Sequence, residues 1–221
     1  MAEPLKVDIW SDIACPWCFI GKREFEAGLA QFTANGGGPV EVTYHSFELA
    51  PENPIEIAES TAEYLAKRKG LQPAVVERML SQVTERAKAA GLDYNFDLVK
   101  NTNTRKAHEL LHLAKAHGVQ AELKEALMSA YFERGIHVGR IDELAQLAAS
   151  VGIDADVARA ALDSGEFADA VASDVAQAAA YGITGVPFFV IDGKYGVSGA
   201  QPAEAFTAVL TEASSPAGVA Q

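Results

Sequence analysis

The feature that most constrains the fold of this chain is a pair of cysteines, Cys15 and Cys18, with two residues between them. They are the only cysteines among 221 residues. They follow an apolar β-type run, Val7–Trp10, and open a stretch with helical spacing. On the first turn of a helix, two residues so spaced have Cα atoms about 5 to 6 Å apart, which a disulfide tolerates. We therefore expect the pair to alternate between dithiol and disulfide with little backbone movement.

The segments around the cysteines predict a βαβ unit. Val7–Trp10 is typical of a buried strand, and Pro16–Phe32 has apolar residues at helical spacing. Asn35–Pro39 contains three consecutive glycines and ends the helix, and Val40–Tyr44 alternates in the manner of a second strand. Crossovers of this kind are right-handed and join parallel strands, so the two strands are expected to be parallel.

The middle of the chain, from about Pro54 to Tyr181, has almost entirely helical signals. Ser60–Glu63 has the pattern of a capping box, Gly70 suits the end of that helix, and Pro73 suits the first turn of the next one. Thr102 or Asn103 is the predicted N-cap of the helix that ends at Gly118. The predicted helices after Gly70 are 73–91, 103–118, 121–134, 142–150, 154–164 and 166–180.

Strand signals return near the end of the chain. Pro187–Ile191 is a compact apolar run, Asp192–Gly193 is a strong hairpin turn, and Lys194–Val197 is the predicted returning strand. Pro202–Glu212 predicts a closing helix, and the small, polar residues 214–221 predict a flexible tail.

This order of elements predicts an α/β protein with a thioredoxin fold interrupted by an all-helical domain. We assign residues 1–53 to the first half of the thioredoxin-like domain, which carries the cysteines. Residues 54–181 form the inserted helical domain, and residues 182–213 complete the thioredoxin-like domain with a hairpin and a helix.

The net charge of −12 argues against a nucleic-acid partner, which requires a basic surface. Residues 1–6 lack a basic region followed by an apolar core, and no apolar run is long enough to span a bilayer. We therefore expect a cytoplasmic protein with neither nucleic acid nor membrane as a partner, and leave its oligomeric state open. In the cytosol a CxxC pair is more often redox-active or metal-binding than structural.

A metal site is the alternative use of these cysteines. His108 and His112 are four residues apart on one predicted helix, a spacing that suits a metal. Their separation from the cysteines is far from that of small zinc modules, so no metal site is predicted. His108 is better explained by an interface between the domains.

The position of Cys15 predicts its chemistry. At the N-terminus of a helix, free backbone N–H groups and the helix dipole favour a thiolate, which is the reactive form of a cysteine. Cys15 is therefore predicted to be the exposed nucleophile with a low pKa, and Cys18, one turn further in, the shielded resolving thiol. Pro16 fits the first helical turn without loss. Trp17 either packs beside the site or contacts substrate.

Asp12, three residues before Cys15, has two interpretations. Its carboxyl group could influence proton transfer at the cysteines, or the residue could only shape the loop and cap the helix. The sequence favours the second interpretation, and Asp12 is kept as a candidate that supports the site.

Several segments together resemble one known family. They are Ser11–Asp12, Cys15–Cys18, Asn101–Thr102, Ala107–His108, Gly185–Phe189 and Val197–Pro202, which span nearly the whole chain. With these segments the chain resembles the FrnE-like branch of the DsbA family. The resemblance implies a thioredoxin fold with a helical insertion and thiol–disulfide oxidoreductase activity on protein or small-molecule thiols.

The resemblance also implies a cis peptide bond at Val186–Pro187, facing the cysteines, where the Val186 backbone pairs with an extended substrate. From the residues alone, a trans proline that begins an edge strand is the simpler interpretation. We further expect Phe47, Leu49 and His108 to line a substrate groove beneath the helical domain. The alternative is that the helical domain only stabilises the fold.

Two other functions stay open at this stage. A neighbouring branch contains glutathione-dependent isomerases and kappa-class transferases, which typically have serine in place of Cys15; two cysteines count against it. The second is a non-catalytic module that binds peptides or unfolded chains. No cofactor is predicted beyond the redox-active Cys15–Cys18 pair, with glutathione or another small thiol as a possible co-substrate.

Overall fold

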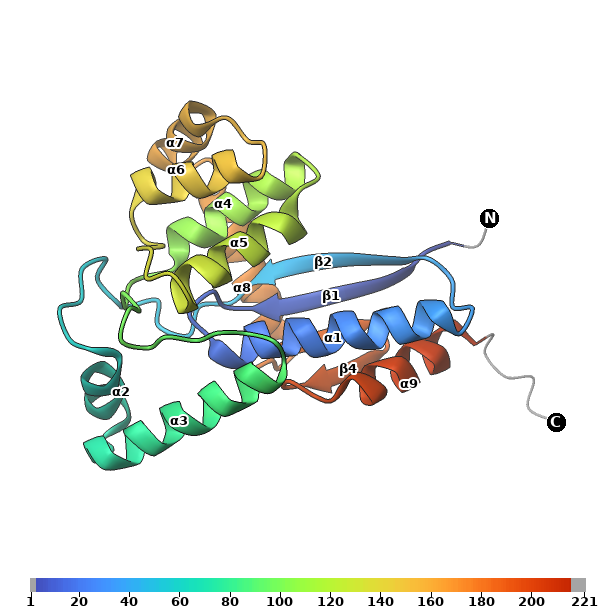
Figure 1. The fold of residues 1–221 in the computed structure, drawn as a ribbon. Coiled ribbons are helices and arrows are strands. Elements are labelled where there is room, and N and C mark those ends of the chain that lie inside the picture. The colour runs from blue at the N-terminus through green and yellow to red at the C-terminus, as the bar shows by residue number, and fades with distance from the viewer. Residues whose placement is uncertain (1–2, 216–221) are drawn as a thin grey trace.

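A computed structural model describes residues 3–215 and places four strands in one sheet, in the order β2-β1-β3-β4 (Figure 1). β1 (Leu5–Ser11) and β2 (Val40–Ser46) are parallel. β3 (Phe188–Ile191) runs antiparallel to β1, and β4 (Tyr195–Ser198) runs antiparallel to β3. The central strand β1 therefore joins the two halves of the chain.

One face of the sheet is covered by α1 (Pro16–Ala34) and α9 (Ala203–Ser214), which lie side by side (Figure 1). Gly28 allows this close approach, since a Cβ atom there would lie 2.6 Å from the Ala203 carbonyl oxygen. Side chains from both helices and from the sheet form one core: Val7, Ile9, Phe25, Phe32, Tyr44, Phe189, Ile191, Phe206 and Leu210.

The residues between β2 and β3 form helices that lie beside the sheet (Figure 1). α2 (Thr61–Lys69) and α3 (Pro73–Ala89) form a helical pair next to the N-terminal end of α1 (Figure 1). The remaining helices are α4 (Arg105–Ala116), α5 (Gln120–Phe132), α6 (Ile141–Ser150), α7 (Ala155–Ser164) and α8 (Ala168–Ala180). Apolar residues of α3 to α7 form a second core that also contains Cys15 and Cys18.

The topology confirms the predicted thioredoxin fold with a helical insertion. The capping box of Ser60 and Glu63, the left-handed Gly70 after α2, and the positive φ angles of Asp192 and Gly193 are all as predicted. The division into domains stays a prediction. None of the helices described between residues 3 and 215 has the length and apolar character needed to cross a membrane.

Some predicted boundaries are wrong. The N-cap of α4 is Thr104, one residue after the predicted Asn103, but the Asn103 side chain still accepts a hydrogen bond from the Arg105 N–H at 2.8 Å and so satisfies a free amide of the first turn. α9 continues to Ser214, so the predicted tail starts too early. Its residues 216–221 lie outside the described part of the chain.

A partly buried polar cluster joins the sheet to α8. His45 on β2 contacts Asp174 of α8 through Nδ1 and Asp8 of β1 through Nε2, both at 2.8 Å. The Trp10 ring stacks on His45 with ring centroids 4.5 Å apart. Burial alone would lower the pKa of His45, but the two carboxylates outweigh burial and raise this pKa to about 9.

The variant His45→Gln is therefore expected to be less stable than the wild type by about 2 kcal/mol below pH 6.5. A pKa raised in the folded state stabilises the fold fully below the ordinary value of 6.5, and this contribution disappears as the pH rises through about 9. The measurement is urea unfolding between pH 6 and 10. His117→Gln, at the exposed end of α4, is the control, and a stability difference independent of pH would contradict the prediction.

Candidate active site

The cysteine motif lies where β1 passes into α1. Cys15 is the N-cap residue of α1, with φ −92° and ψ 111°, and Pro16 occupies the first helical turn as predicted. The N–H of Cys18 donates to the Cys15 carbonyl oxygen at 3.0 Å, and the Cys15 N–H donates to the Asp12 carbonyl oxygen at 3.3 Å. Both cysteines are free thiols on the same first turn of the helix.

The predicted exposure of Cys15 is wrong. Cys15 is 4% exposed and Cys18 is 3% exposed, because both side chains pack into the core that the helical insertion shares with the start of α1. The two thiols nevertheless differ in access. Cys15 lines a cavity of about 530 Å³, whereas Cys18 is absent from its wall.

This cavity is bounded by the cysteine motif, the loop after β2, the helices α2 and α3, and the end of α5, and its wall is mainly apolar. Three of its wall residues have side chains that are close to half exposed: Trp17, Leu49 and Met79. Trp17 is 43% exposed and does not pack into the core. Of its two predicted roles, this exposure favours contact with substrate over packing. The wall also includes Ala50, Asn53, Thr61, Tyr64, Leu65, Arg68, Lys69, Leu80, Gln82, Val83, Phe96, Val99, Asn101, Thr102, Thr104, Tyr131 and Phe132.

The pKa values of the two thiols are shifted in opposite directions. The hydrogen bond with Cys18, together with burial, raises the pKa of the Cys15 thiol well above its ordinary value. Burial also opposes ionisation of Cys18, but the hydrogen bond from Cys15 and the positive charge of Lys124 outweigh it and lower the pKa of Cys18. The pKa of Cys15 was predicted to be low, and this is corrected, because the hydrogen bond with Cys18 and burial both disfavour its thiolate.

The Val186–Pro187 segment faces the motif from the start of β3. Sγ of Cys15 lies 3.5 Å from the Val186 carbonyl oxygen, and the Val186–Pro187 peptide bond is cis. Pro187 is buried against α1, where a Cβ atom on Gly21 would lie only 2.8 Å from its Cγ. The segment that the resemblance implied for substrate binding is thus in contact with Cys15.

Asp12 is a buried acceptor that ties three segments to the motif. One carboxyl oxygen accepts from the Leu49 N–H at 2.7 Å. The other accepts from the Thr104 hydroxyl at 2.8 Å and lies 3.2 Å from Nε2 of His108. Burial would raise the pKa of Asp12, but these hydrogen bonds and the charge of His108 lower it.

The structure places only one of the three predicted groove residues on the cavity wall. Leu49 lines the cavity, but His108 is fully buried and contacts Asp12, and Phe47 packs against the cluster of Trp10, Ala178 and Ile183. This corrects the expectation that all three line one groove. His108 lies in the interior rather than on the cavity wall because its ring contacts the buried Asp12 carboxyl group.

His108 and His112 are on one helix, as predicted, but they contact different carboxylates. Nε2 of His112 lies 3.1 Å from Asp174 and 3.2 Å from the Ser46 hydroxyl, whereas His108, one helical turn earlier, contacts Asp12.

Sequence reasoning missed two residues near the motif. The Tyr94 hydroxyl donates to the Pro16 carbonyl oxygen at 2.7 Å, from a loop that has no sequence signal. Lys124 had a signal, because it shares the apolar face of α5 with Leu127 and Tyr131 at helical spacing.

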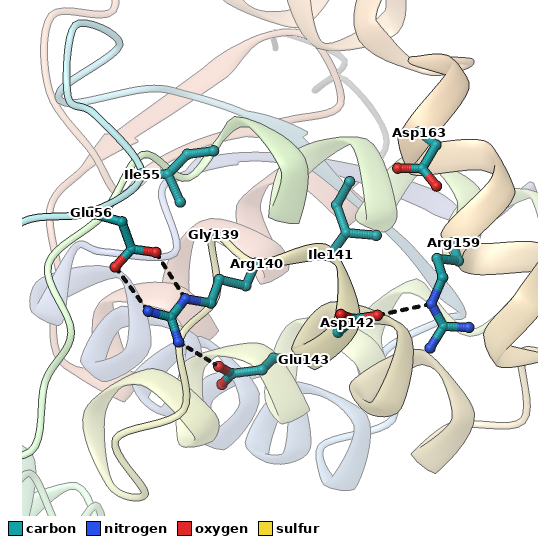
Figure 2. A pocket seen from close by; sticks show the side chains of 9 residues that line it. All are labelled: Ile55, Glu56, Gly139, Arg140, Ile141, Asp142, Glu143, Arg159 and Asp163. Atoms are coloured by element: carbon teal, nitrogen blue, oxygen red, sulfur yellow. Dashed lines mark hydrogen bonds and ion pairs between the residues drawn. The ribbon is translucent and has the colours of Figure 1, made fainter.

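A second hollow, of about 730 Å³, lies away from the cysteines and is larger (Figure 2). Its arginines already pair with its own carboxylates, Arg140 with Glu56 and Arg159 with Asp142 (Figure 2). None of the residues that line it belongs to the cysteine motif. The cavity at Cys15, although smaller, is therefore the candidate active site.

Fold and site together define a thioredoxin-fold protein whose reactive group is a vicinal cysteine pair at a helix N-terminus. Residues 6–211 match the DSBA-like thioredoxin domain family, so the chain belongs to that family and is a thiol–disulfide oxidoreductase.

Known proteins are similar to this chain over nearly its whole length. The probable DsbA oxidoreductase SCO1869 from Streptomyces coelicolor is 41% identical, with a TM-score of 0.88 and coverage of 95% of this chain and 89% of that one. YwbO of Bacillus subtilis (strain 168) is 27% identical over 93% of this chain and 96% of its own length. The cytosolic disulfide reductase DsbM from Pseudomonas aeruginosa, also solved with GSH, shares the fold at 19% identity, with a TM-score of 0.66 and coverage of 94% and 98%.

Proposed function

We propose that this chain is a cytoplasmic dithiol–disulfide oxidoreductase in which Cys15 attacks the substrate and Cys18 resolves the mixed disulfide. The observation that carries the proposal is the difference in access, since Cys15 lines the cavity and Cys18 does not. A substrate disulfide that enters the cavity meets Cys15 first.

The exchange proceeds in two balanced steps. The proton of Cys15 passes to the Cys18 sulfur, and the Cys15 thiolate attacks the substrate disulfide, forming a bond to one sulfur and releasing the other as a thiolate. Cys18 then loses its proton and attacks the Cys15 sulfur, which breaks the mixed disulfide and releases the second substrate thiol. The substrate is reduced by two electrons and the pair is oxidised to a disulfide; the reverse sequence oxidises a dithiol.

The apolar cavity wall favours substrates that carry an apolar group next to the reacting sulfur. Trp17, Leu49 and Met79 offer exposed apolar surface on the wall of the cavity that Cys15 lines, and burying such surface favours binding by about 25 cal/mol per Å². Val186, whose carbonyl oxygen lies near Cys15, supplies backbone for an extended peptide.

Glutathione is the proposed small-molecule co-substrate, and the cytoplasm the proposed compartment. DsbM, which has the same fold, is described as cytosolic and has been solved with GSH, and this supports both proposals. The presence of cysteine at position 15 favours electron exchange over the glutathione-dependent isomerases, and membership in the FrnE-like branch stays a prediction.

The test is the turbidity assay of insulin reduction with dithiothreitol. We expect the wild type to shorten the delay before precipitation, and the double variant Cys15→Ser/Cys18→Ser to behave as dithiothreitol alone. A redox titration in glutathione buffers then measures the equilibrium between dithiol and disulfide, and so the favoured direction. Equal delays with and without the wild type would contradict the proposed function.

A further inference from the structure

Lys124 is a buried cation that the steps above do not use. It lies in the middle of α5 and is 1% exposed, and its Nζ has no hydrogen-bond partner among residues 3–215. An ammonium group removed from water is costly unless negative charge compensates for the loss of hydration. The charge that compensates Lys124 must therefore come from groups near it in the core.

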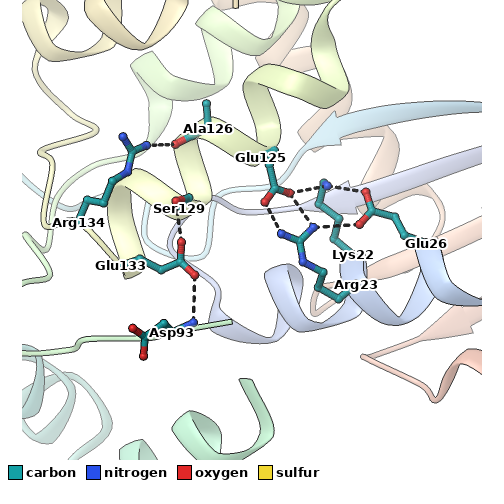
Figure 3. Close-up of polar contacts among 9 residues, drawn as sticks. All are labelled: Lys22, Arg23, Glu26, Asp93, Glu125, Ala126, Ser129, Glu133 and Arg134. Carbon is teal, nitrogen blue, oxygen red and sulfur yellow. Dashed lines mark hydrogen bonds and ion pairs between the residues drawn. The ribbon is translucent and has the colours of Figure 1, made fainter. Parts of the chain in front are cut away.

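Two contacts fix α5, which carries Lys124, against β2 and α1. Gln120, one turn earlier on α5, exchanges hydrogen bonds of 3.0 and 2.9 Å with the backbone of Tyr44 in β2. Glu125, the residue after Lys124, pairs with Lys22 of α1 at 2.6 Å (Figure 3). Lys22 is one helical turn after Cys18, on the same side of α1. α5 is thus clamped between β2 and the face of α1 that carries Cys18.

The charged groups around Lys124 come from three elements. Cys18 and Cys15 at the start of α1, and Asp12 in the loop before them, attract its charge, whereas Lys22 repels it. The ring of Tyr44 in β2 has its centroid 5.8 Å from Nζ. Burial is the largest influence and lowers the pKa of Lys124 to about 8, and in return its charge favours the thiolate of Cys18.

We propose that Lys124 is a positioning residue for thiol–disulfide exchange: its buried ammonium group, reaching from the helical insertion, stabilises the thiolate of Cys18. The proposal rests on the proposed function for the role of Cys18 as the resolving thiol. When Cys15 is bonded to substrate, Cys18 releases its proton to solvent, and the thiolate next to Lys124 attacks the Cys15 sulfur. Stabilising that thiolate also favours the reduced form of the pair over its disulfide.

The test measures Cys18 alone, in a Cys15→Ala background. The ultraviolet absorbance of the thiolate, followed against pH, gives the midpoint at which Cys18 ionises. We expect Lys124→Met to raise this midpoint by about one pH unit, a tenfold change in the ionisation equilibrium. Lys124→Arg keeps the charge and is expected to restore most of the shift. Lys115→Met, which removes an exposed lysine on α4, is the control and is expected to change nothing.

A second readout uses the protein with both cysteines. In glutathione buffers, Lys124→Met is expected to shift the equilibrium about tenfold toward the Cys15–Cys18 disulfide, because the dithiol loses the stabilised thiolate. An unchanged midpoint and an unchanged equilibrium in a folded Lys124→Met variant would overturn the inference. If Lys124→Met does not fold, Lys124→Gln takes its place. If neither neutral variant folds, the inference also fails, because Lys124 would then serve the fold rather than Cys18.

These outcomes are separate from failure of the proposed function. If the wild type does not accelerate insulin reduction, the exchange scheme fails while the Cys18 titration still reports the effect of Lys124. If the wild type is active and Lys124→Met leaves the titration unchanged, only the role of Lys124 is rejected.

Discussion

Cys18→Ser is expected to turn the protein into a trap that stays covalently attached to its substrates. The variant keeps the thiol that lines the cavity but lacks the one that releases the mixed disulfide. Because release would then depend on a second molecule, turnover is expected to fall by about 100-fold or more. Mixed disulfides from cells that express the variant are measured on non-reducing gels and identified after reduction.

Cys15→Ser is the matched control for the trap. It retains a single thiol of the same pair, but that thiol lies outside the cavity wall, so we expect few mixed disulfides. Equal trapping by the two variants would show that access to the cavity does not decide which sulfur attacks. Stronger trapping by Cys15→Ser would reverse the assigned roles.

Asp12→Ala is expected to cost the protein about 3 to 5 kcal/mol of stability. The substitution leaves the Leu49 N–H, the Thr104 hydroxyl and the His108 ring without their acceptor in the interior. Three segments that meet at the cysteine motif would lose their common attachment, so activity is expected to fall together with stability. Urea unfolding and insulin reduction measure the two effects.

Two further variants separate the causes. Asp12→Asn keeps the shape and one acceptor oxygen and is expected to lose less stability than Asp12→Ala. Asp163→Asn, an exposed aspartate on α7, is the control and should be neutral. Because the pKa of Asp12 is lowered in the fold, its contribution is present above the ordinary value of 3.8 and disappears as the pH falls below it. A difference between Asp12→Ala and wild type that persists undiminished in acid would contradict this account.

The elements of the fold could be predicted because each has a local cause. The alternation in Val40–Tyr44, the turn at Asp192–Gly193 and the capping box at Ser60 operate over a few residues and were found where the sequence indicated them. Boundaries were less predictable, because competing local hydrogen bonds decide them. Asn103 shows this, since its side chain caps the Arg105 N–H of the first turn while the N-cap position falls one residue later, on Thr104.

The candidate site was predicted only in part. Cys15 and Leu49 line the cavity, Trp17 does so in one of its two predicted roles, and Val186 lies against Cys15 as the resemblance implied. His108 was expected in the same groove, but its bond to Asp12 holds it in the interior. No local pattern records such a bond, because its two partners are 96 residues apart in the chain.

The sequence by itself determined which two sulfurs can react with each other, since a spacing of three residues on a helical turn brings them together whatever surrounds them. It also determined the order of strands and helices, because hydrophobic period and turn residues act locally. Only the tertiary structure decided how the two thiols differ. Burial, the cavity at Cys15 and the Lys124 charge that favours the Cys18 thiolate come from α2, α3 and α5, and electrostatic energies depend on distances and hydration that exist only once those helices have packed.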